Sequence, residues 1–137
     1  MYKLYQMEPL IRECFLDGKT FSFPINGSSM QPLLHTNDIV TIAKIDEVKK
    51  GDIILFKRNE SQYVLHRVIK IKNKLSFVGD HQTKIETGID SSQLVAKVIS
   101  YKKKGSNKSH NLNSLSYKIY KILVRFSLVR FIFSKLL

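Results

Sequence analysis

The sequence predicts a mainly β fold: an antiparallel, barrel-like sheet with a short helix before it and a basic helix after it. Short runs rich in β-branched and aromatic residues follow one another, and turn-forming residues separate them at close spacing. No helical segment lies between these runs, so the crossover units that parallel sheets need are absent. With 137 residues, 43% of them hydrophobic, the chain is large enough for one domain with its own core.

The first part of the chain is predicted to form a helix and two strands. Apolar residues recur at helical spacing over residues 7–17, and Gly18 follows as a stop. Residues 20–25 alternate and contain aromatic side chains, which indicates a strand. A turn bounded by glycine and proline occupies residues 27–32, and residues 38–44 form the next predicted strand.

The middle of the chain continues the sheet. Residues 53–56 are uniformly apolar, which predicts a strand covered on both faces and therefore central. Residues 63–71 and 75–78 are predicted strands joined by a short turn, and residues 94–101 complete the sheet. Between the last two strands, residues 79–90 are expected to be a polar connection.

Three regions are therefore expected: a β domain over residues 1–101, a polar basic linker over 102–113 and a basic apolar helix over 114–137. From Leu115 to Leu137, Lys and Arg interrupt the apolar residues too often for a membrane-spanning helix. Such a helix fits the surface of an anionic membrane or of a partner protein. Docking on its own sheet explains the pattern equally well.

The net charge of +12 is concentrated in the second part of the chain. No Asp or Glu follows Asp90, whereas the basic residues there are Lys97, Lys102, Lys103, Lys104, Lys108, Lys118, Lys121, Arg125, Arg130 and Lys135. This asymmetry predicts an anionic partner: lipid head groups, an acidic protein or, less favoured by the remaining sequence, nucleic acid. The sequence makes no prediction about oligomeric state.

Several classes of protein are not indicated. Cys14 is the only cysteine, which excludes an intramolecular disulfide and a site built on several cysteines. No metal-ligand spacing or cofactor motif is evident, so neither a metal nor a cofactor is expected. The amino-terminal residues contain no apolar run of signal-peptide or spanning length. A cytoplasmic or membrane-peripheral location is expected.

A reactive serine hydroxyl is predicted at Ser29, which lies in the turn between Gly27 and Pro32. Gly27 permits a close backbone approach or a positive φ, and Pro32 fixes φ downstream, so the turn can hold a hydroxyl out of the sheet. His66 lies in an apolar strand, and Asp80 follows a glycine at the end of another strand. A serine hydroxyl needs a base such as imidazole, and a carboxylate can orient that imidazole.

These residues belong to a set of motifs that resembles the type I signal peptidase and LexA-like serine peptidase superfamily. The order and rough spacing hold from about Phe21 to Val98. Bacterial signal peptidases and LexA-type proteins carry a lysine as base, whereas His66 stands at that point here. The chain therefore resembles the Ser-His branch of archaeal and endoplasmic-reticulum enzymes. The matching motifs are Gly27-Ser28-Ser29-Met30-Gln31-Pro32, Asn37-Asp38-Ile39-Val40, Lys50-Gly51-Asp52-Ile53-Ile54, His66-Arg67-Val68 and Gly79-Asp80-His81.

The resemblance implies a role for each catalytic residue. Ser29 is the expected nucleophile, and His66 is the expected general base. Asp80 is the expected orienting carboxylate, with Glu86 as a second acidic residue and Asp90 as its competitor. His81 stands where the family usually has Asn.

The resemblance also describes the surroundings of the nucleophile. The oxyanion would be bound by the Ser29 backbone N–H and a neighbouring donor. Gly27 stands where some members carry a hydroxyl, so a main-chain donor must serve. Ser28 is the nearest alternative nucleophile, and Met30 is expected to line the substrate cleft together with the turn that ends at Pro32.

The sequence thus predicts a serine endopeptidase that cleaves a leader or signal segment from a small precursor peptide. One alternative is a LexA-like self-cleaving regulator, against which stand His66 in place of lysine and the lack of an amino-terminal DNA-binding module in this sequence. The other alternative is a catalytically silent binding module that keeps the same fold.

Overall fold

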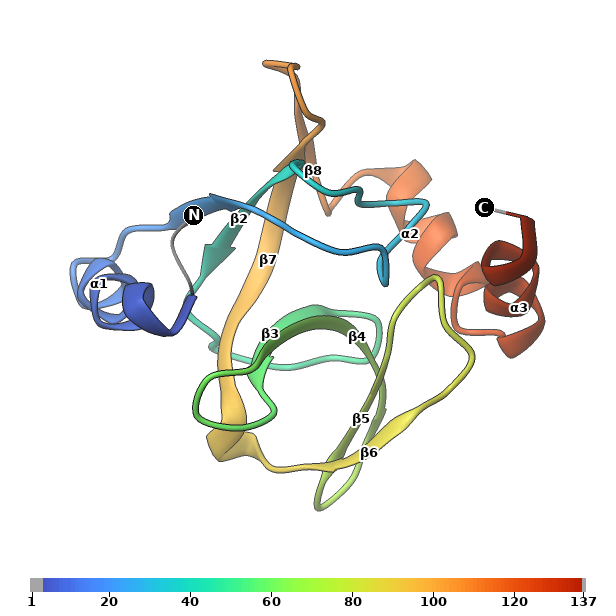
Figure 1. Ribbon diagram of the computed structural model, residues 1–137, viewed down its shortest axis with the longest axis horizontal. Coiled ribbons are helices and arrows are strands. Elements are labelled where there is room, and N and C mark those ends of the chain that lie inside the picture. The colour runs from blue at the N-terminus through green and yellow to red at the C-terminus, as the bar shows by residue number, and fades with distance from the viewer. Residues whose placement is uncertain (1–3, 137) are drawn as a thin grey trace.

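The computed structural model describes residues 4–136. One antiparallel sheet contains all the strands of this region, in the order β1-β2-β7-β3-β4-β5-β6, and β8 pairs with β7. Figure 1 shows α1 at one end of the molecule and α2 and α3 at the other. The elements are α1 (Leu4–Leu16), β1 (Phe21–Pro24), β2 (Ile39–Ala43), β3 (Ile53–Lys57), β4 (Tyr63–Ile71), β5 (Leu75–Val78), β6 (Glu86–Ile89), a 3₁₀ turn (Ser91–Gln93), β7 (Leu94–Lys102), β8 (Ser109–Asn111), α2 (Leu115–Leu123) and α3 (Ser127–Leu136).

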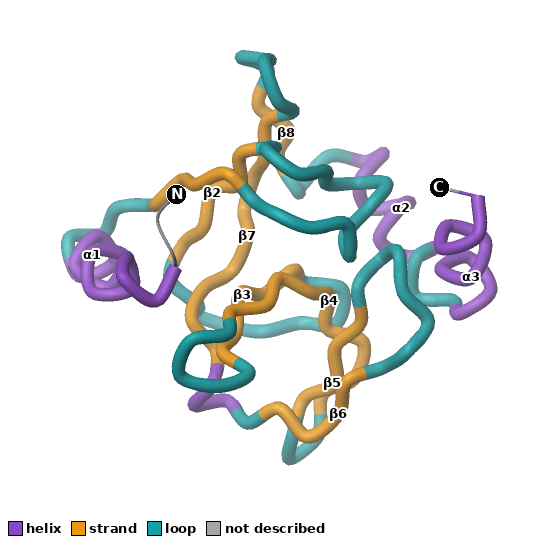
Figure 2. The backbone as a smooth tube through the Cα atoms, in the orientation of Figure 1, coloured by secondary structure: helices purple, strands orange, loops and turns teal. Residues whose placement is uncertain are grey.

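The predicted mainly β, antiparallel class is confirmed, with helices at both ends of the chain. The barrel is not closed, because the two end strands of the sheet, β1 and β6, do not pair with each other within the described residues. The ends of the sheet therefore remain separate, and loops and helices flank them (Figure 2).

The central position predicted for residues 53–56 is confirmed, since β3 lies between β7 and β4. Ile53 and Leu55 pack in a core cluster with α1, β1, β2 and β7. Ile54 and Phe56 point to the other face and pack in a second cluster with β4, β5 and β6. Alternate residues of one strand thus serve two cores, which explains the uninterrupted apolar run.

Helix α1 packs against the first of these clusters. Ile11 is its one buried residue, and Gly18, with φ of 71°, follows its end. Glu8 connects the helix to the sheet, because it accepts a hydrogen bond from the Tyr63 hydroxyl and pairs with Lys57 at 3.1 Å. The helix expected over residues 7–17 is therefore present, and it begins one turn earlier than predicted.

Two strands were not predicted from the sequence. The expected polar connection over residues 79–90 contains β6, and the expected linker over 102–113 contains β8, which returns to pair with β7. Neither segment has a clear alternating pattern, because β6 has an edge position and β8 consists of three residues at the margin of the sheet.

The single helix expected over residues 114–137 is instead two helices, α2 and α3. The side chain of Arg130 lies at the turn between these two helices. Its Nη1 donates hydrogen bonds to the carbonyl oxygens of Val124 at 2.9 Å and Arg125 at 2.6 Å. These carbonyls lie at the end of α2, where the helix offers them no amide partner. Residues 1–3 of the expected β domain and residue 137 of the expected helix lie outside the described residues.

The helices of residues 4–136 all lack the combination of length and apolarity that crossing a lipid bilayer requires.

Candidate active site

The loop between β1 and β2, which carries Ser29, meets the loop between β5 and β6 close to α2 and α3 (Figure 2). Both loops end on strands that are fixed in the sheet. The site is therefore built from connections that the sheet and the carboxy-terminal helices hold in place.

The Ser29 loop is closed on itself by Thr36. The Thr36 hydroxyl accepts a hydrogen bond from the Gly27 amide at 3.0 Å and donates one to the Gly27 carbonyl at 3.1 Å. Gly27 has φ of 102°, a conformation that side chains disfavour, so the predicted need for glycine at this position is confirmed. The Gln31–Pro32 peptide bond is cis. Asp38 ends the loop and accepts a hydrogen bond from the His35 amide at 2.8 Å.

The Gly79-Asp80-His81 turn holds the backbone of Ser29 directly. The His81 amide donates to the Ser29 carbonyl at 2.9 Å. A Cβ at Gly79 would lie 2.4 Å from that same oxygen, closer than any real contact allows. Gln82 completes the turn, because its side-chain oxygen accepts from the Gly79 amide at 3.2 Å. Only glycine at position 79 lets the two loops approach this closely.

Ser29 and His66 line one cavity of about 280 Å³. His66 comes from β4, whereas Ser29 comes from the loop that the Gly79 turn supports. Met30 also lines this cavity and is 3% exposed, so it supports the loop from the core side as well. Ser28, the alternative nucleophile, is exposed and is not part of the cavity lining.

His66 is held as a neutral imidazole. It is 6% exposed, and burial lowers its pKa to about 4, against the favourable charge of Glu86 and the weaker one of Asp80. Its Nδ1 is buried and has no hydrogen-bond partner among the described residues. A neutral imidazole at neutral pH can accept a proton from a nearby hydroxyl.

Within residues 4–136, no hydrogen bond joins Asp80 to this imidazole. Its carboxylate is fully buried and binds the Arg67 guanidinium through two hydrogen bonds of 2.8 Å, and it accepts a third from the Tyr120 hydroxyl at 2.7 Å. The orienting role expected for Asp80 is therefore not the one these contacts describe. Both carboxylate oxygens of Asp80 are occupied by Arg67 and Tyr120. These contacts fix the turn that holds Ser29.

Arg67 extends this contact to two further elements. Its Nη1 donates to the Gly51 carbonyl at 2.7 Å and to the Tyr117 hydroxyl at 2.8 Å. Burial disfavours the charged guanidinium, but the charge and hydrogen bonds of Asp80 outweigh it and raise the pKa of Arg67 above its ordinary value. Tyr117 and Tyr120 belong to α2, so this helix is attached to the sheet through the same ion pair.

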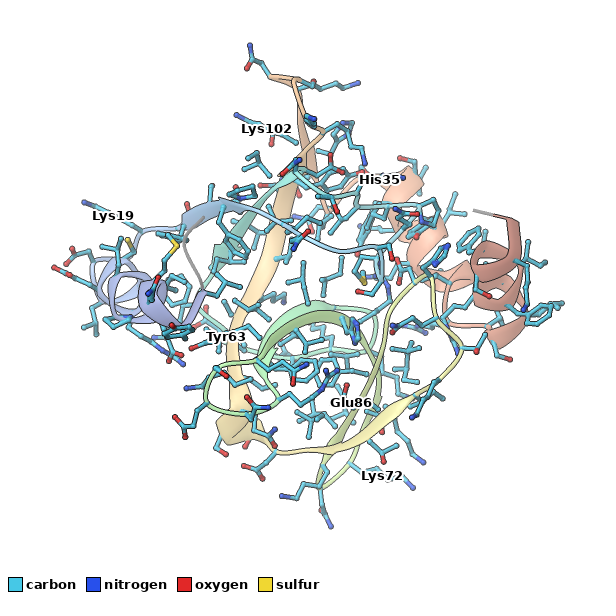
Figure 3. The ribbon with its side chains drawn as sticks, in the orientation of Figure 1. Lys19, His35, Tyr63, Lys72, Glu86 and Lys102 are labelled. Carbon is cyan, nitrogen blue, oxygen red and sulfur yellow. The ribbon has the colours of Figure 1, made fainter. Side chains whose placement is uncertain are left out.

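Glu86, the second predicted acidic residue, begins β6 (Figure 3). It lines a cavity of about 610 Å³ together with His66, His81 and Ser134. Its carboxylate forms two hydrogen bonds with Arg58, of 2.6 and 2.8 Å, which lower the pKa of Glu86.

Asp90, the competing candidate, is not brought to the site. Its side chain caps the 3₁₀ turn by accepting from the Ser92 amide at 3.0 Å, and it pairs with Lys74 at 2.8 Å. The hydrogen bonds from Lys74 and Ser92 lower the pKa of this exposed carboxyl. Its role is local capping.

Sequence reasoning missed three polar residues at the site. Arg58 and Gln82 line both cavities, and Gln62 lines the one that contains Ser29. They occupy a hairpin loop and a turn, where polar residues are ordinary, so no local signal separated them from solvent-exposed neighbours. Among the described residues, no group of His, Cys, Asp and Glu side chains could hold a metal ion.

Comparison with known proteins gives a family match. The family model described as Peptidase S24-like matches residues 3–99. This range contains Ser29, His66 and Asp80, whereas α2 and α3 lie beyond it. A search of curated proteins finds no match.

We expect Gly79→Ala to lower the reactivity of Ser29, because the added methyl group must displace the Ser29 carbonyl. Reaction of Ser29 with a fluorophosphonate probe should fall by about a hundredfold. Gly105→Ala is the control, because the Cβ added there would meet no atom within 4 Å, so any effect reflects only the strain of its positive φ. Equal reactivity of the Gly79→Ala and Gly105→Ala proteins would contradict the role assigned to this turn.

Proposed function

Since the chain belongs to the Peptidase S24-like family, we propose that it is a serine endopeptidase that cleaves a leader or signal segment from a small precursor peptide. The family covers serine peptidases and LexA-like self-cleaving regulators. The observation that carries the proposal is the single cavity that Ser29 shares with a buried, neutral His66. A Ser-His pair also agrees with the archaeal and endoplasmic-reticulum branch of the superfamily.

In the proposed reaction, the Ser29 hydroxyl attacks the scissile carbonyl carbon while His66 takes its proton. The tetrahedral intermediate collapses when the imidazolium of His66 returns this proton to the leaving amine, which leaves an acyl group on Ser29. Water then attacks the acyl group while His66 takes a proton from it. His66 returns this proton to the Ser29 oxygen, which releases the carboxylic acid product and regenerates the Ser29 hydroxyl.

The negative oxygen of the intermediate needs donors close to Ser29. The Ser29 amide forms no hydrogen bond with any part of residues 4–136, so it is available to the oxyanion. Because Gly27 supplies no hydroxyl, the second donor must come from the cavity lining. Gln82 and Asn26 both line this cavity and carry side-chain amides.

We assign the acidic residues different roles. Glu86 is the carboxylate whose charge most favours the imidazolium form of His66, ahead of Asp80. We therefore infer that Glu86 stabilises the cation that forms during turnover, and that Asp80 acts as a positioning residue through Arg67 and the Ser29 turn.

A third cavity supports an extended peptide as the substrate. It has a volume of about 570 Å³ and lies between α1 and the sheet. Ile25, Asn26, Tyr63 and Leu65 line both this cavity and the one that contains Ser29. A peptide that reaches Ser29 can thus place apolar side chains against Ile25 and Leu65 on the way.

Self-cleavage is the second candidate function, and the family match itself favours it, because the family includes self-cleaving regulators. In that case the scissile bond belongs to the chain itself. The two functions differ in molecularity, since self-cleavage within one chain proceeds at a rate that does not depend on protein concentration.

Replacing Ser29 with Ala should abolish cleavage of a mixed peptide library followed by mass spectrometry, because no hydroxyl remains to form the acyl-enzyme. The loss should be at least about 10³-fold, as expected when a nucleophile is removed. Ser28→Ala is the matched control and should retain cleavage, since Ser28 lies outside the cavity.

Full activity of the Ser29→Ala protein would refute the assignment. Concentration-independent cleavage of the chain itself, without cleavage of any library peptide, would favour the self-cleaving regulator. If the wild-type protein cleaves nothing and does not react with a fluorophosphonate, the catalytically silent binding module is the correct interpretation.

The pH dependence should follow the buried imidazole. Since the base must be neutral and burial lowers the pKa of His66 to about 4, kcat/KM should persist as pH falls below 6.5 and decline only near pH 4. Arg58→Gln should move this decline to higher pH, because the Arg58 charge lowers the pKa of His66. Lys72→Gln, a distant and exposed control, should not move it (Figure 3). A decline centred at pH 6.5 in the wild-type protein would contradict the buried, neutral base.

A further inference from the structure

The carboxy-terminal helices expose apolar side chains on their outer faces, which we call the C-terminal apolar surface. Each of these residues is at least 42% exposed, and a group of large exposed apolar side chains indicates an interaction surface more than a single one does. Figure 1 shows α2 and α3 together at the end of the molecule opposite α1. The residues are Leu115, Ile119, Ile122, Leu123 and Phe126 in and after α2, and Leu128, Phe131 and Ile132 in α3.

This surface is not the face that attaches α2 to the sheet. Tyr117 and Tyr120 contact the Arg67–Asp80 pair, and both point inward. An α-helix turns by about 100° per residue, which places Ile119 and Ile122 on the side opposite these tyrosines. The two interpretations that the sequence left open, docking and an outward surface, therefore apply to different faces of the same helix.

Helix α3 repeats the arrangement. Arg130 is 2% exposed and points inward, where its Nε donates to the Gln82 carbonyl at 3.1 Å. Leu128, Phe131 and Ile132 lie on the outer side and remain exposed. Because the inward polar contacts are already formed, burial of these apolar residues requires a surface outside the described chain.

The charges beside this surface favour one kind of partner. Lys118 lies on the flank of α2 and is exposed, and Lys135 lies on the outer side of α3 with its Nζ 5.7 Å from the centre of the Phe131 ring. No acidic residue follows Asp90 to oppose them. Apolar side chains bordered by cations match the acyl chains and anionic head groups of a lipid surface.

We propose that the C-terminal apolar surface binds an anionic lipid bilayer, with α2 and α3 lying in the plane of its interface. The helices have 9 and 10 residues, about half of the roughly 20 needed to span, so they fit an interfacial position. Ser134 of α3 lines the cavity that contains His66 and Glu86. Binding therefore brings the proposed active site close to the lipid surface.

The direct test is sedimentation of the full chain with vesicles of phosphatidylcholine alone and of phosphatidylcholine mixed with phosphatidylglycerol. The protein should bind the mixed vesicles and should bind neutral vesicles at least about tenfold more weakly. Raising the salt concentration from about 0.1 M to about 1 M should weaken binding, because it shortens the screening length from about 10 Å to about 3 Å.

Substitutions separate the apolar contribution from the electrostatic one. The Ile122→Ser/Phe126→Ser protein should lose at least about tenfold in binding to mixed vesicles, whereas the control Leu16→Ser should bind as the wild type does. Leu16 is 88% exposed and lies in α1, at the far end of the molecule (Figure 1). Urea unfolding should show the same stability for the Leu16→Ser and Ile122→Ser/Phe126→Ser proteins, since all three side chains are exposed.

A charge series completes the test. Lys118→Gln should reduce binding to mixed vesicles by about fivefold, and the control Lys19→Gln, just after α1, should not (Figure 3). Ser29→Ala protein should bind as the wild type does, so this result is independent of peptidase activity.

Three outcomes would overturn the proposal. The first is an absence of binding to either vesicle, and the second is equal binding to neutral and anionic vesicles. The third is a concentration-dependent dimer that Ile122→Ser/Phe126→Ser dissociates, which would assign the C-terminal apolar surface to a second copy of the chain.

Discussion

The buried ion pair between Arg67 and Asp80 is the contact on which the rest of the structure depends. Its two side chains are fully buried, and their remaining hydrogen bonds go to the Gly51 carbonyl and to Tyr117 and Tyr120 of α2. Isolated buried charges are costly, but this pair has bidentate geometry and its polar atoms have partners. It therefore joins the turn beside Ser29, the middle of β4 and the carboxy-terminal helices in one network.

This network explains why a carboxylate in a family motif is separate from the imidazole. Asp80 holds the turn in which the neighbouring His81 amide binds the Ser29 carbonyl. Asp80 therefore acts on the site by positioning Ser29. His66 remains neutral because it is buried, and Glu86 supplies the larger favourable charge for its cation. The proposed nucleophile, the proposed base and the residues that support them thus lie on separate parts of the fold, and the loops between strands bring them together.

Much of the sheet could be predicted from local patterns, because alternation and turns are encoded within a few residues. The apolar run of β3 identified the central strand. Ser29 and His66, which the motifs single out, line one cavity. The partners of Asp80 could not be predicted, because one of them, Tyr120, is distant in sequence and reaches Asp80 only through the packing of α2 against the sheet. Arg130 was missed for a similar reason: a basic residue in a basic segment gives no sign that the end of α2 will bury it.

The most direct test of this account is the unfolding of Asp80→Asn in urea, measured together with fluorophosphonate labelling of Ser29 in the same samples. Removing one partner of a buried pair leaves Arg67 uncompensated, so the free energy of unfolding should fall by about 3–5 kcal/mol. Labelling should decrease with the loss of folded structure. Unchanged stability together with lost labelling would contradict the account, because it would show that Asp80 acts on His66 itself.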